Sequence, residues 1–368
     1  MPQLIADDLS FAQNQYAYLQ KQVPDNAMPK TFVNGKNVNS NMVWWTSGFY
    51  PGTLLYIYEY TKDKIVLAEA EKRMQNLEVE KSDTIDHDLG FKMFCSFGNA
   101  YRITKKPHYK DVVLEASHSL SMRYRPSIQL IQSWNKSVNF NCPVIIDNMM
   151  NLEMLEWSSK NGGSEQYNTI AVKHANTTLK NHFRKDFSSF HVVDYDLATG
   201  KVLKKVTWQG ANDTSAWSRG QGWAMYGFTM MYRFTHDAKY LAQARGVAHF
   251  ILSNPNLPAD KVPYWDFNAP GIPNTLRDVS AAAIYASAFL ELGQYTAGSE
   301  KQNYINTAKI ILRALSTDEY RAKLGENGGF ILKHNVGSMP HKSEIDVPLT
   351  YADYYFLEAL LRYKKWYL

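Results

Sequence analysis

Hydrophobic residues recur along the chain with the 3.6-residue period of an α-helix, and the helices that they predict come in pairs of different character. In each pair, a helix that is apolar on nearly all sides comes first, and an amphipathic helix usually follows after a short polar break. A helix that is apolar all round must be buried, whereas an amphipathic helix faces water on one side. The apolar helices are expected to start near Gly48, His87, Ile145, Ser218, Val279 and Tyr351.

The two ends of the chain complete this pattern. The last apolar helix has no following partner, and the N-terminal helix, expected over Asp8–Gln22, has no preceding one. Pairing these two helices closes a ring. The chain therefore predicts an all-α fold, an (α/α)6 barrel of six inner and six outer helices, in a single catalytic domain over residues 1–368. An open α-solenoid is the alternative, but it would show a steadier repeat and no pairing of its ends.

Two stretches interrupt the helical pattern. Residues 190–209 alternate polar and apolar positions around the turn "ATG", which predicts a small β-hairpin insert. The stretch His334–Pro348 precedes the last apolar helix and is expected to be a loop.

Polar and aromatic residues stand where the apolar helices begin. Because the inner helices of an alternating barrel all run the same way, Trp45, Asp88, Asp147 and Arg219 should meet at one end. A single Asp at such a position is more often a helix cap than a catalyst. The set is harder to explain as caps, because two neighbouring carboxyls can have different pKa values, so that one stays protonated and serves as a general acid.

Composition narrows the function further. The net charge of +5, from 40 basic and 35 acidic side chains, is too weak and dispersed to indicate nucleic acid, but it is compatible with an anionic substrate. Aromatic residues make up 14% of the chain and suit sugar faces as well as cores. Two cysteines, Cys95 and Cys142, cannot form a disulfide framework, and Cys95 is expected to be buried in a helix. No apolar run reaches membrane-spanning length, and no residues have metal-ligand spacing.

Six motifs resemble the unsaturated glucuronyl hydrolases, glycoside hydrolase family 88, in the versions typical of Bacteroidetes. They are "WWTSGFYPG", "HDLGF", "SWNKS", "IIDNMMNLEML", "WSRGQGWAMYG" and "YADYYFLEALLR". The likeness covers residues 8 to 367. It implies an enzyme that removes the 4,5-unsaturated uronic acid which polysaccharide lyases leave at the non-reducing end of oligosaccharides. The reaction is hydration of the C4=C5 vinyl ether, and it needs no metal or cofactor.

The resemblance also assigns roles. Asp147 matches the general acid and base, and Asp88 matches the second essential carboxylate. Substrate contacts are implied for His191, Gln209, Arg219, Trp223, Trp45 and Trp134. Ser338 and Lys342 lie where some family members receive a sulfate group, although the register here does not match cleanly. Purely structural roles stay open: an exposed hairpin residue for His191, a turn residue for Gln209, and a buried anchor for Trp223 or Trp134.

The expected partner is an unsaturated oligosaccharide, with a glycosaminoglycan disaccharide, sulfated or not, as the leading class and gellan or ulvan fragments as further options. Two other functions remain open: an unsaturated rhamnogalacturonyl hydrolase acting on pectin fragments, and a non-catalytic glycan-binding barrel. We expect no nucleic-acid or membrane partner, and a monomer or weak homo-oligomer. The expected compartment is the periplasm if a signal peptide has been removed, and otherwise the cytoplasm.

Overall fold

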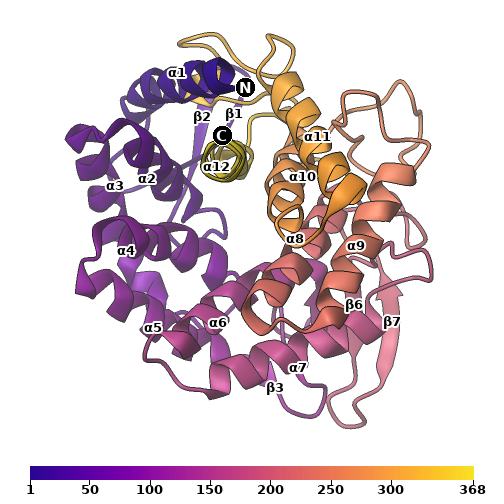
Figure 1. Cartoon of the computed structure of the whole chain (residues 1–368). Helices are drawn as coiled ribbons and strands as arrows, with labels where there is room; N and C mark the ends of the chain where they lie inside the picture. Colours follow the sequence, from indigo (N-terminus) through magenta and orange to yellow (C-terminus); the bar gives the residue numbers. More distant parts are fainter.

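The computed structural model describes residues 1–368, and its helices form two concentric rings (Figure 1). The inner ring contains α2 (Phe49–Thr61), η2 with α4 (Gly90–Gly98, Asn99–Thr104), η3 with α6 (Ile146–Asn151, Leu152–Lys160), α8 (Ser218–Thr235), α10 (Val279–Leu292) and α12 (Thr350–Tyr367). The outer ring contains α1 (Pro2–Gln20), α3 (Lys64–Leu77), α5 (Pro107–Ser121), α7 (Gln166–Asn181), α9 (Ala238–Ser253) and α11 (Gly298–Leu315). The predicted (α/α)6 barrel is confirmed.

Burial separates the two rings as the sequence pattern requires. Every residue of α10 is buried, and so are the first 14 residues of α8, from Ser218 to Met231. Outer helices such as α7 and α11 bury one face only. One hydrophobic cluster of 83 buried residues fills the space within and between the rings. Apolar burial on this scale is the main force that holds the barrel together.

The first and last helices close the ring. The hydroxyl of Tyr16 in α1 donates to Asp353 in α12 at 3.0 Å, and Arg321 and Ser316 bind Asp8 in α1. The helix α1 begins at Pro2, six residues before the predicted start, because proline is well tolerated in the first turn of a helix.

The predicted hairpin is present as β6 (Val192–Tyr195) and β7 (Val202–Val206), and β5 (Pro143–Ile145) adds a third antiparallel strand. Other short elements were not expected: β1 and β2 (Met28–Val33, Lys36–Ser40), β3 and β4 (Tyr124–Arg125, Leu130–Ile131), η1 (Glu78–Ser82) and η4 (Asn327–Gly329). The predicted loop at 334–348 forms a hairpin of β8 (Asn335–Ser338) and β9 (Ser343–Val347), so its description as a loop was wrong.

Three of these small sheets lie at the end where the inner helices begin, which we call the mouth. The hydroxyl of Thr31 in β1 donates to the carbonyl of Pro348, just before α12, at 2.6 Å. The backbone N–H of Ile146, at the start of η3, donates to the carbonyl of His191 at 3.0 Å. The opposite end, where the inner helices finish, is the base.

Candidate active site

Neither Asp88 nor Asp147 caps a helix. Asp88 precedes η2, whose N-cap residue, Leu89, makes no side-chain capping bond. Asp147 lies in the first turn of η3, and its Oδ2 atom is buried without a hydrogen-bond partner. Asp278, in contrast, accepts the backbone N–H of Ser280 and is the cap of α10. The structural explanation available for a single Asp at the mouth therefore holds for Asp278 and fails for the two predicted catalytic residues.

Each of the two carboxyls faces a buried histidine. The Nε2 atom of His87 is 3.4 Å from Oδ1 of Asp88, and the Nε2 atom of His191 is 3.7 Å from Oδ2 of Asp147. Burial lowers the pKa of both imidazoles to about 3, so both rings are neutral near pH 7. The histidines are therefore neutral neighbours of the carboxyls and do not act as positive counter-charges.

The backbone fixes the tautomer of His191. Its Nδ1 atom accepts two N–H groups, from Trp208 and Gln209, each at 3.1 Å. A neutral ring that accepts at Nδ1 carries its proton on Nε2, so the Nε2–H bond is directed toward Asp147. The ring also stacks against Trp217, with centroids 4.5 Å apart. His191 is thus a rigid donor at the mouth, and it lies just before β6 rather than exposed on the hairpin.

Both carboxyls hold their protons more tightly than usual. Burial raises the pKa of Asp147 to about 7, against the opposing field of Arg219. Burial also raises the pKa of Asp88, helped by the negative charges of Asp86 and Asp147 and opposed by Lys92. The field of Asp147 contributes to the raised pKa of Asp88, so the two carboxyls lie within electrostatic reach of each other. A carboxyl with a pKa near neutrality can donate a proton at physiological pH.

Arg219 is bound from several sides. Its Nη1 atom donates to Asp278 at 2.8 Å and to the carbonyl of Val336 at 2.7 Å. Its Nη2 atom donates to Gln209 at 2.9 Å and to the carbonyl of Gly337 at 2.6 Å. Both terminal nitrogens are therefore engaged within the protein, although the resemblance implied that Arg219 contacts the substrate. Arg219 thus connects α8 to the β8–β9 hairpin and also holds Gln209.

Aromatic rings form the floor of this end of the barrel. Trp45 is half-buried, and its ring centroid lies 4.9 Å from that of Tyr351 and 5.5 Å from that of Phe91. Trp223 is completely buried, which fits the buried anchor that the sequence left open better than the implied contact with the substrate. Its indole N–H has no partner within hydrogen-bond distance. The N–H nevertheless lies close enough to Asp147 to lower the pKa of that carboxyl, which partly offsets the effect of burial.

Comparison with known proteins identifies the family. The family model described as Glycosyl Hydrolase Family 88 matches residues 17–366. The chain belongs to this family. An unsaturated glucuronyl hydrolase of Formosa agariphila is 48% identical over 86% of this chain and 79% of its own length. An unsaturated chondroitin disaccharide hydrolase of Streptococcus agalactiae is 33% identical over 92% of this chain and 86% of its own length. A crystal structure of an unsaturated glucuronyl hydrolase specific for heparin superposes with a TM-score of 0.96 at 43% identity. The superposition covers 99% of this chain and 98% of that one.

The family 88 chain is therefore a glycoside hydrolase, as its motifs predicted, and the rim of its mouth suits a sugar chain. Trp134, Phe140, Trp208 and His341 form a line of neighbouring rings, with centroid separations of 5.6, 5.3 and 4.9 Å. Trp134 was predicted as a platform, whereas Trp208 was missed. The Trp208 ring is 38% exposed, and its position next to the predicted Gln209 was the available signal.

Ser338 and Lys342 lie on the β8–β9 hairpin of this family 88 barrel. The Ser338 hydroxyl forms a 2.7 Å hydrogen bond with Nδ1 of His341, within the turn. Lys342 is exposed and has a left-handed backbone, with φ of 52°. Lys342 therefore remains available to a charged substituent, whereas Ser338 is already paired.

Two further observations concern the predicted absences. Nowhere in the structure do three or more His, Cys, Asp or Glu side chains come together as a possible metal site. None of the helices combines the length and hydropathy needed to cross a membrane.

Proposed function

We propose that this family 88 hydrolase is an unsaturated glucuronyl hydrolase, which removes the 4,5-unsaturated uronic acid from lyase-generated oligosaccharides. One observation carries the proposal: Asp88 and Asp147 share the mouth, neither caps a helix, and burial raises the pKa of both carboxyls. A protonated carboxyl beside a second carboxyl is the equipment that hydration of a vinyl ether needs, because one proton must reach carbon and another must leave water.

The steps follow from this pair. Asp147 gives its proton to C4, and the positive charge that develops is shared between C5 and the ring oxygen. Water then adds at C5 and loses a proton to the Asp147 carboxylate, which restores the acid. The hemiketal formed at C5 opens to a ketone, and the hemiacetal left at C1 releases the rest of the oligosaccharide. Asp88 orients the ring hydroxyls, and the field of the Asp147 carboxylate, once it has given up its proton, raises the pKa of Asp88.

The neighbouring residues position the sugar in this proposal. His191 offers its Nε2–H to Asp147 or to a hydroxyl group, since its other nitrogen is held by the backbone. Trp45 presents a half-buried ring to the unsaturated sugar, and Trp134 one to the next sugar. Two donors remain for the uronate carboxylate: the N–H₂ group of Gln209 and the Nε–H of Arg219. The Oε1 atom of Gln209 and both Nη atoms of Arg219 already have partners.

The substrate class that we propose is a glycosaminoglycan disaccharide. The relatives named for heparin and for chondroitin disaccharide support this choice. Lys342 is the residue that would receive a sulfate group on the second sugar, since it is exposed and cationic. Turnover of matched sulfated and unsulfated disaccharides measures that preference directly.

The test is the ultraviolet absorbance of the conjugated double bond, which hydration removes. We expect the wild type to consume unsaturated glycosaminoglycan disaccharides, and the Asp147→Asn variant to lose about 100-fold or more of its turnover while keeping its fold. Near-wild-type turnover of Asp147→Asn would show that another group donates the proton.

Two other functions are tested by the same assay. An unsaturated rhamnogalacturonan disaccharide should turn over far more slowly than the glycosaminoglycan ones, because family 88 membership favours the glucuronyl reaction. A non-catalytic barrel would bind the disaccharides and leave their absorbance unchanged.

A further inference from the structure

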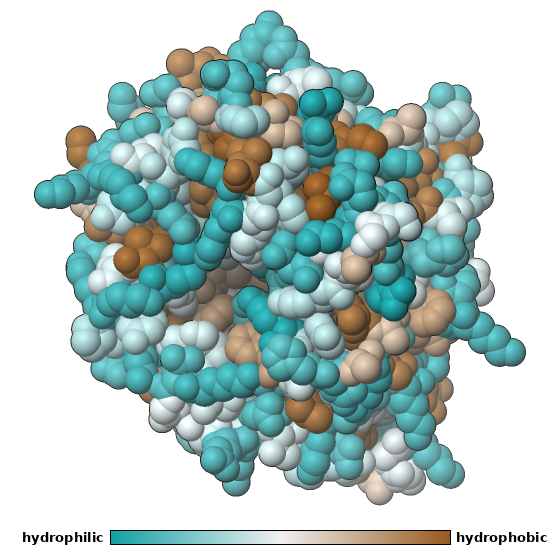
Figure 2. Space-filling model, in the orientation of Figure 1, coloured by the Kyte–Doolittle hydropathy of each residue, from teal (hydrophilic) through white to brown (hydrophobic).

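The barrel encloses a second cavity, of about 750 Å³, at its base. We call it the base chamber. Its walls come from the later parts of inner helices that also reach the mouth, including α2, α4, α6, α8 and α12. Figure 1 looks onto this end of the barrel, and Figure 2, in the same orientation, shows the surface hollowed near its middle. The base chamber therefore opens to solvent on the face opposite the mouth.

A layer of aromatic rings separates the base chamber from the mouth. Phe91 lies against Trp223 with centroids 5.2 Å apart, and Trp223 lies against Tyr355 at 5.3 Å. Phe49 completes the layer against Phe91 at 5.5 Å. All four side chains are at most 2% exposed. The base chamber is thus not the lower part of the site that contains Asp147.

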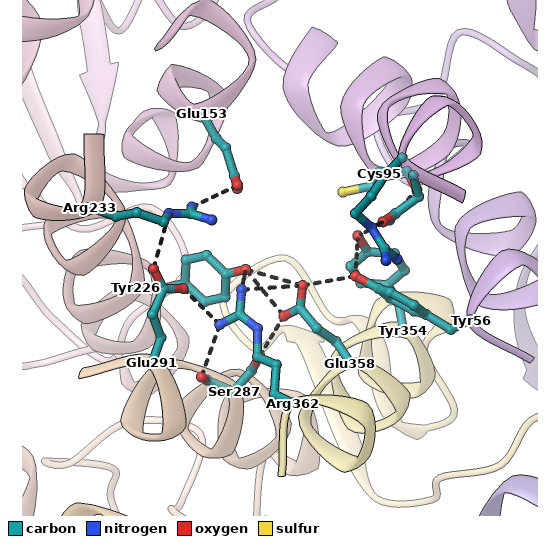
Figure 3. A network of polar contacts seen from close by, with 12 residues as sticks. Tyr56, Cys95, Glu153, Tyr226, Arg233, Ser287, Glu291, Tyr354, Glu358 and Arg362 are labelled. Atoms are coloured by element: carbon teal, nitrogen blue, oxygen red, sulfur yellow. Dashed lines mark hydrogen bonds and ion pairs between the residues drawn. The ribbon is translucent and has the colours of Figure 1, made fainter. Parts of the chain in front are cut away.

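The inner wall of the base chamber is a polar network with fixed geometry (Figure 3). Glu358 accepts the hydroxyls of Tyr56 at 2.9 Å and Tyr226 at 3.1 Å. Arg362 pairs with Glu291 at 2.9 Å and lies 3.6 Å from Glu358. Each of these side chains is held by at least one partner, so the wall does not have to reorganise when a ligand binds.

A second ion-paired cluster lies beside it. Arg233 joins Glu153 at 2.7 Å and Glu291 at 3.2 Å, so Glu291 lies behind both arginines. The carboxylate of Glu153 and the guanidinium of Arg233 are each partly exposed. They can therefore still accept from, or donate to, a molecule in the base chamber.

The charge of the lining favours an anion. Three carboxylates line the base chamber, at Glu59, Glu153 and Glu358, against six cationic side chains. Three of these cations, at Lys62, Lys364 and Lys365, are exposed and have no carboxylate within ion-pair distance. Unpaired cations beside a low-dielectric cavity attract negative charge into it.

The shape and the polarity favour a sugar over a simple inorganic anion. Half-buried rings line the base chamber: Tyr60, Phe94, Trp157, Phe234 and Trp366. Such rings stack on the apolar faces of pyranoses. Carboxylates among the cations supply acceptors for hydroxyl groups, which an inorganic anion would not use. The volume falls in the range of ordinary small-molecule sites.

We propose that the base chamber is a second, non-catalytic binding site for an acidic sugar, such as a uronic acid or the uronate end of an oligosaccharide. The carboxylate of the sugar meets the cations at the rim, and its ring lies among the aromatic side chains. This assignment follows from the lining of the base chamber alone and does not depend on the reaction at the mouth.

Cys95 provides the probe for this proposal. Its side chain is a half-buried free thiol that lines the base chamber, rather than the fully buried one expected from sequence, whereas Cys142 is completely buried. The experiment measures the rate at which a methanethiosulfonate reagent modifies Cys95 in the full-length protein. We expect D-glucuronate to slow the modification in a saturable way, and D-glucose to do so less well, because it lacks the charge.

Reversing the rim charges localises the effect. The triple variant Lys62→Glu, Lys364→Glu and Lys365→Glu should raise the half-protecting concentration of D-glucuronate by about tenfold or more. The matched control Lys173→Glu, on the exposed face of α7, should leave it unchanged. Turnover at the mouth should stay at the wild-type level in both variants, so a failure of the proposed function would appear separately, as absent turnover in the wild type.

Two results would overturn the proposal. One is modification of Cys95 at the same rate at every concentration of D-glucuronate. The other is equal protection by glucuronate and glucose in wild type and triple variant alike. Should the thiol prove unreactive, an NMR titration with ¹³C-labelled D-glucuronate decides the question. The triple variant must then lose a D-glucuronate binding site that the wild type and Lys173→Glu both show. Identical titrations of the three proteins would contradict binding in the base chamber.

Discussion

Asp147 is a residue whose chemistry conflicts with its burial. Its carboxyl is 11% exposed, and the folded protein holds its proton up to about pH 7, whereas the unfolded chain releases it near the ordinary value of 3.8. Between these two values the native state binds one proton more than the unfolded state, so the free energy of unfolding falls as pH rises. The site is therefore maintained at a cost in stability at neutral pH.

Replacing this carboxyl by an amide removes the cost. Relative to the wild type, Asp147→Asn should gain about 2.5 kcal/mol of stability between about pH 5 and pH 8, since about two pH units of this window lie below the raised pKa of Asp147. Urea unfolding at the two pH values measures the difference. For comparison, hydrogen bonding by Lys239 lowers the pKa of Asp237, so Asp237→Asn should show a pH-independent difference over this range. If the stability difference from the wild type changed with pH by the same amount in both variants, Asp147 would not be protonated in the folded protein.

The sequence singled out the candidate reacting residues but not their partners. Asp88, Asp147 and His191 stand in recognisable motifs, and the structure brings them to the mouth. The sequence could not show that both terminal nitrogens of Arg219 are hydrogen-bonded within the protein. Their acceptors Val336 and Gly337 lie more than a hundred residues away, in a stretch without periodicity. The complete burial of Trp223 likewise depends on neighbours from other helices.

At the scale of elements, Arg219 fixes the β8–β9 hairpin over the mouth. It reaches two backbone carbonyls of the hairpin from the first turn of α8. The hairpin also contacts the β1–β2 hairpin, through Lys30 and Glu344 at 3.5 Å. Because the planar guanidinium makes several directed bonds that an ammonium group cannot reproduce, the hairpin should be sensitive to this one residue.

We expect Arg219→Lys to loosen the hairpin while the barrel stays folded. Hydrogen–deuterium exchange over residues 335–347 should speed up, and KM should rise, because the rim that receives the second sugar is no longer held in place. Arg277→Lys, near the start of the next inner helix, is the control, since its bonds go to Asp260 and Val262 rather than to the hairpin. Unchanged exchange in Arg219→Lys would show that other contacts hold the hairpin.

The elements themselves were largely predictable, because inner helices are marked by continuous apolar runs. The small hairpins were harder. The β1–β2 turn carried a usable signal in Asn34–Gly35, both with positive φ, flanked by alternating residues. The β8–β9 hairpin gave none, since Glu344 and Asp346 in its second strand also have positive φ and break the period of two.

At the scale of the whole molecule, the ring depends on the contact between its first and last helices. Asp353 in α12 accepts the backbone N–H groups of Ile331 and Leu332, each at 2.9 Å, and the hydroxyl of Tyr16 in α1 at 3.0 Å. The sequence predicted that these two helices pair, because each lacked a partner. It could not show that one carboxylate makes the connection.

Asp353→Ala should weaken this closure. Three buried donors would lose their acceptor, at about 1–3 kcal/mol each, so we expect a loss of several kcal/mol in the free energy of unfolding. Thermal unfolding measures it, and turnover at a permissive temperature should persist, because Asp353 makes no contact with Asp88 or Asp147. Asp237→Ala, which removes the cap of α9 and an exposed ion pair with Lys239, should cost about 1 kcal/mol. Equal losses in both variants would contradict a special role for Asp353.

The central claim is that Asp147 delivers a proton from a carboxyl that stays protonated near neutrality. The most direct measurement is the pH dependence of kcat/KM for hydration of an unsaturated disaccharide, followed by loss of its ultraviolet absorbance. Because the free enzyme must carry the proton, kcat/KM should fall tenfold per pH unit above about pH 7, the pKa to which burial raises Asp147. A kcat/KM that stays constant from about pH 6 to pH 9 would contradict the account.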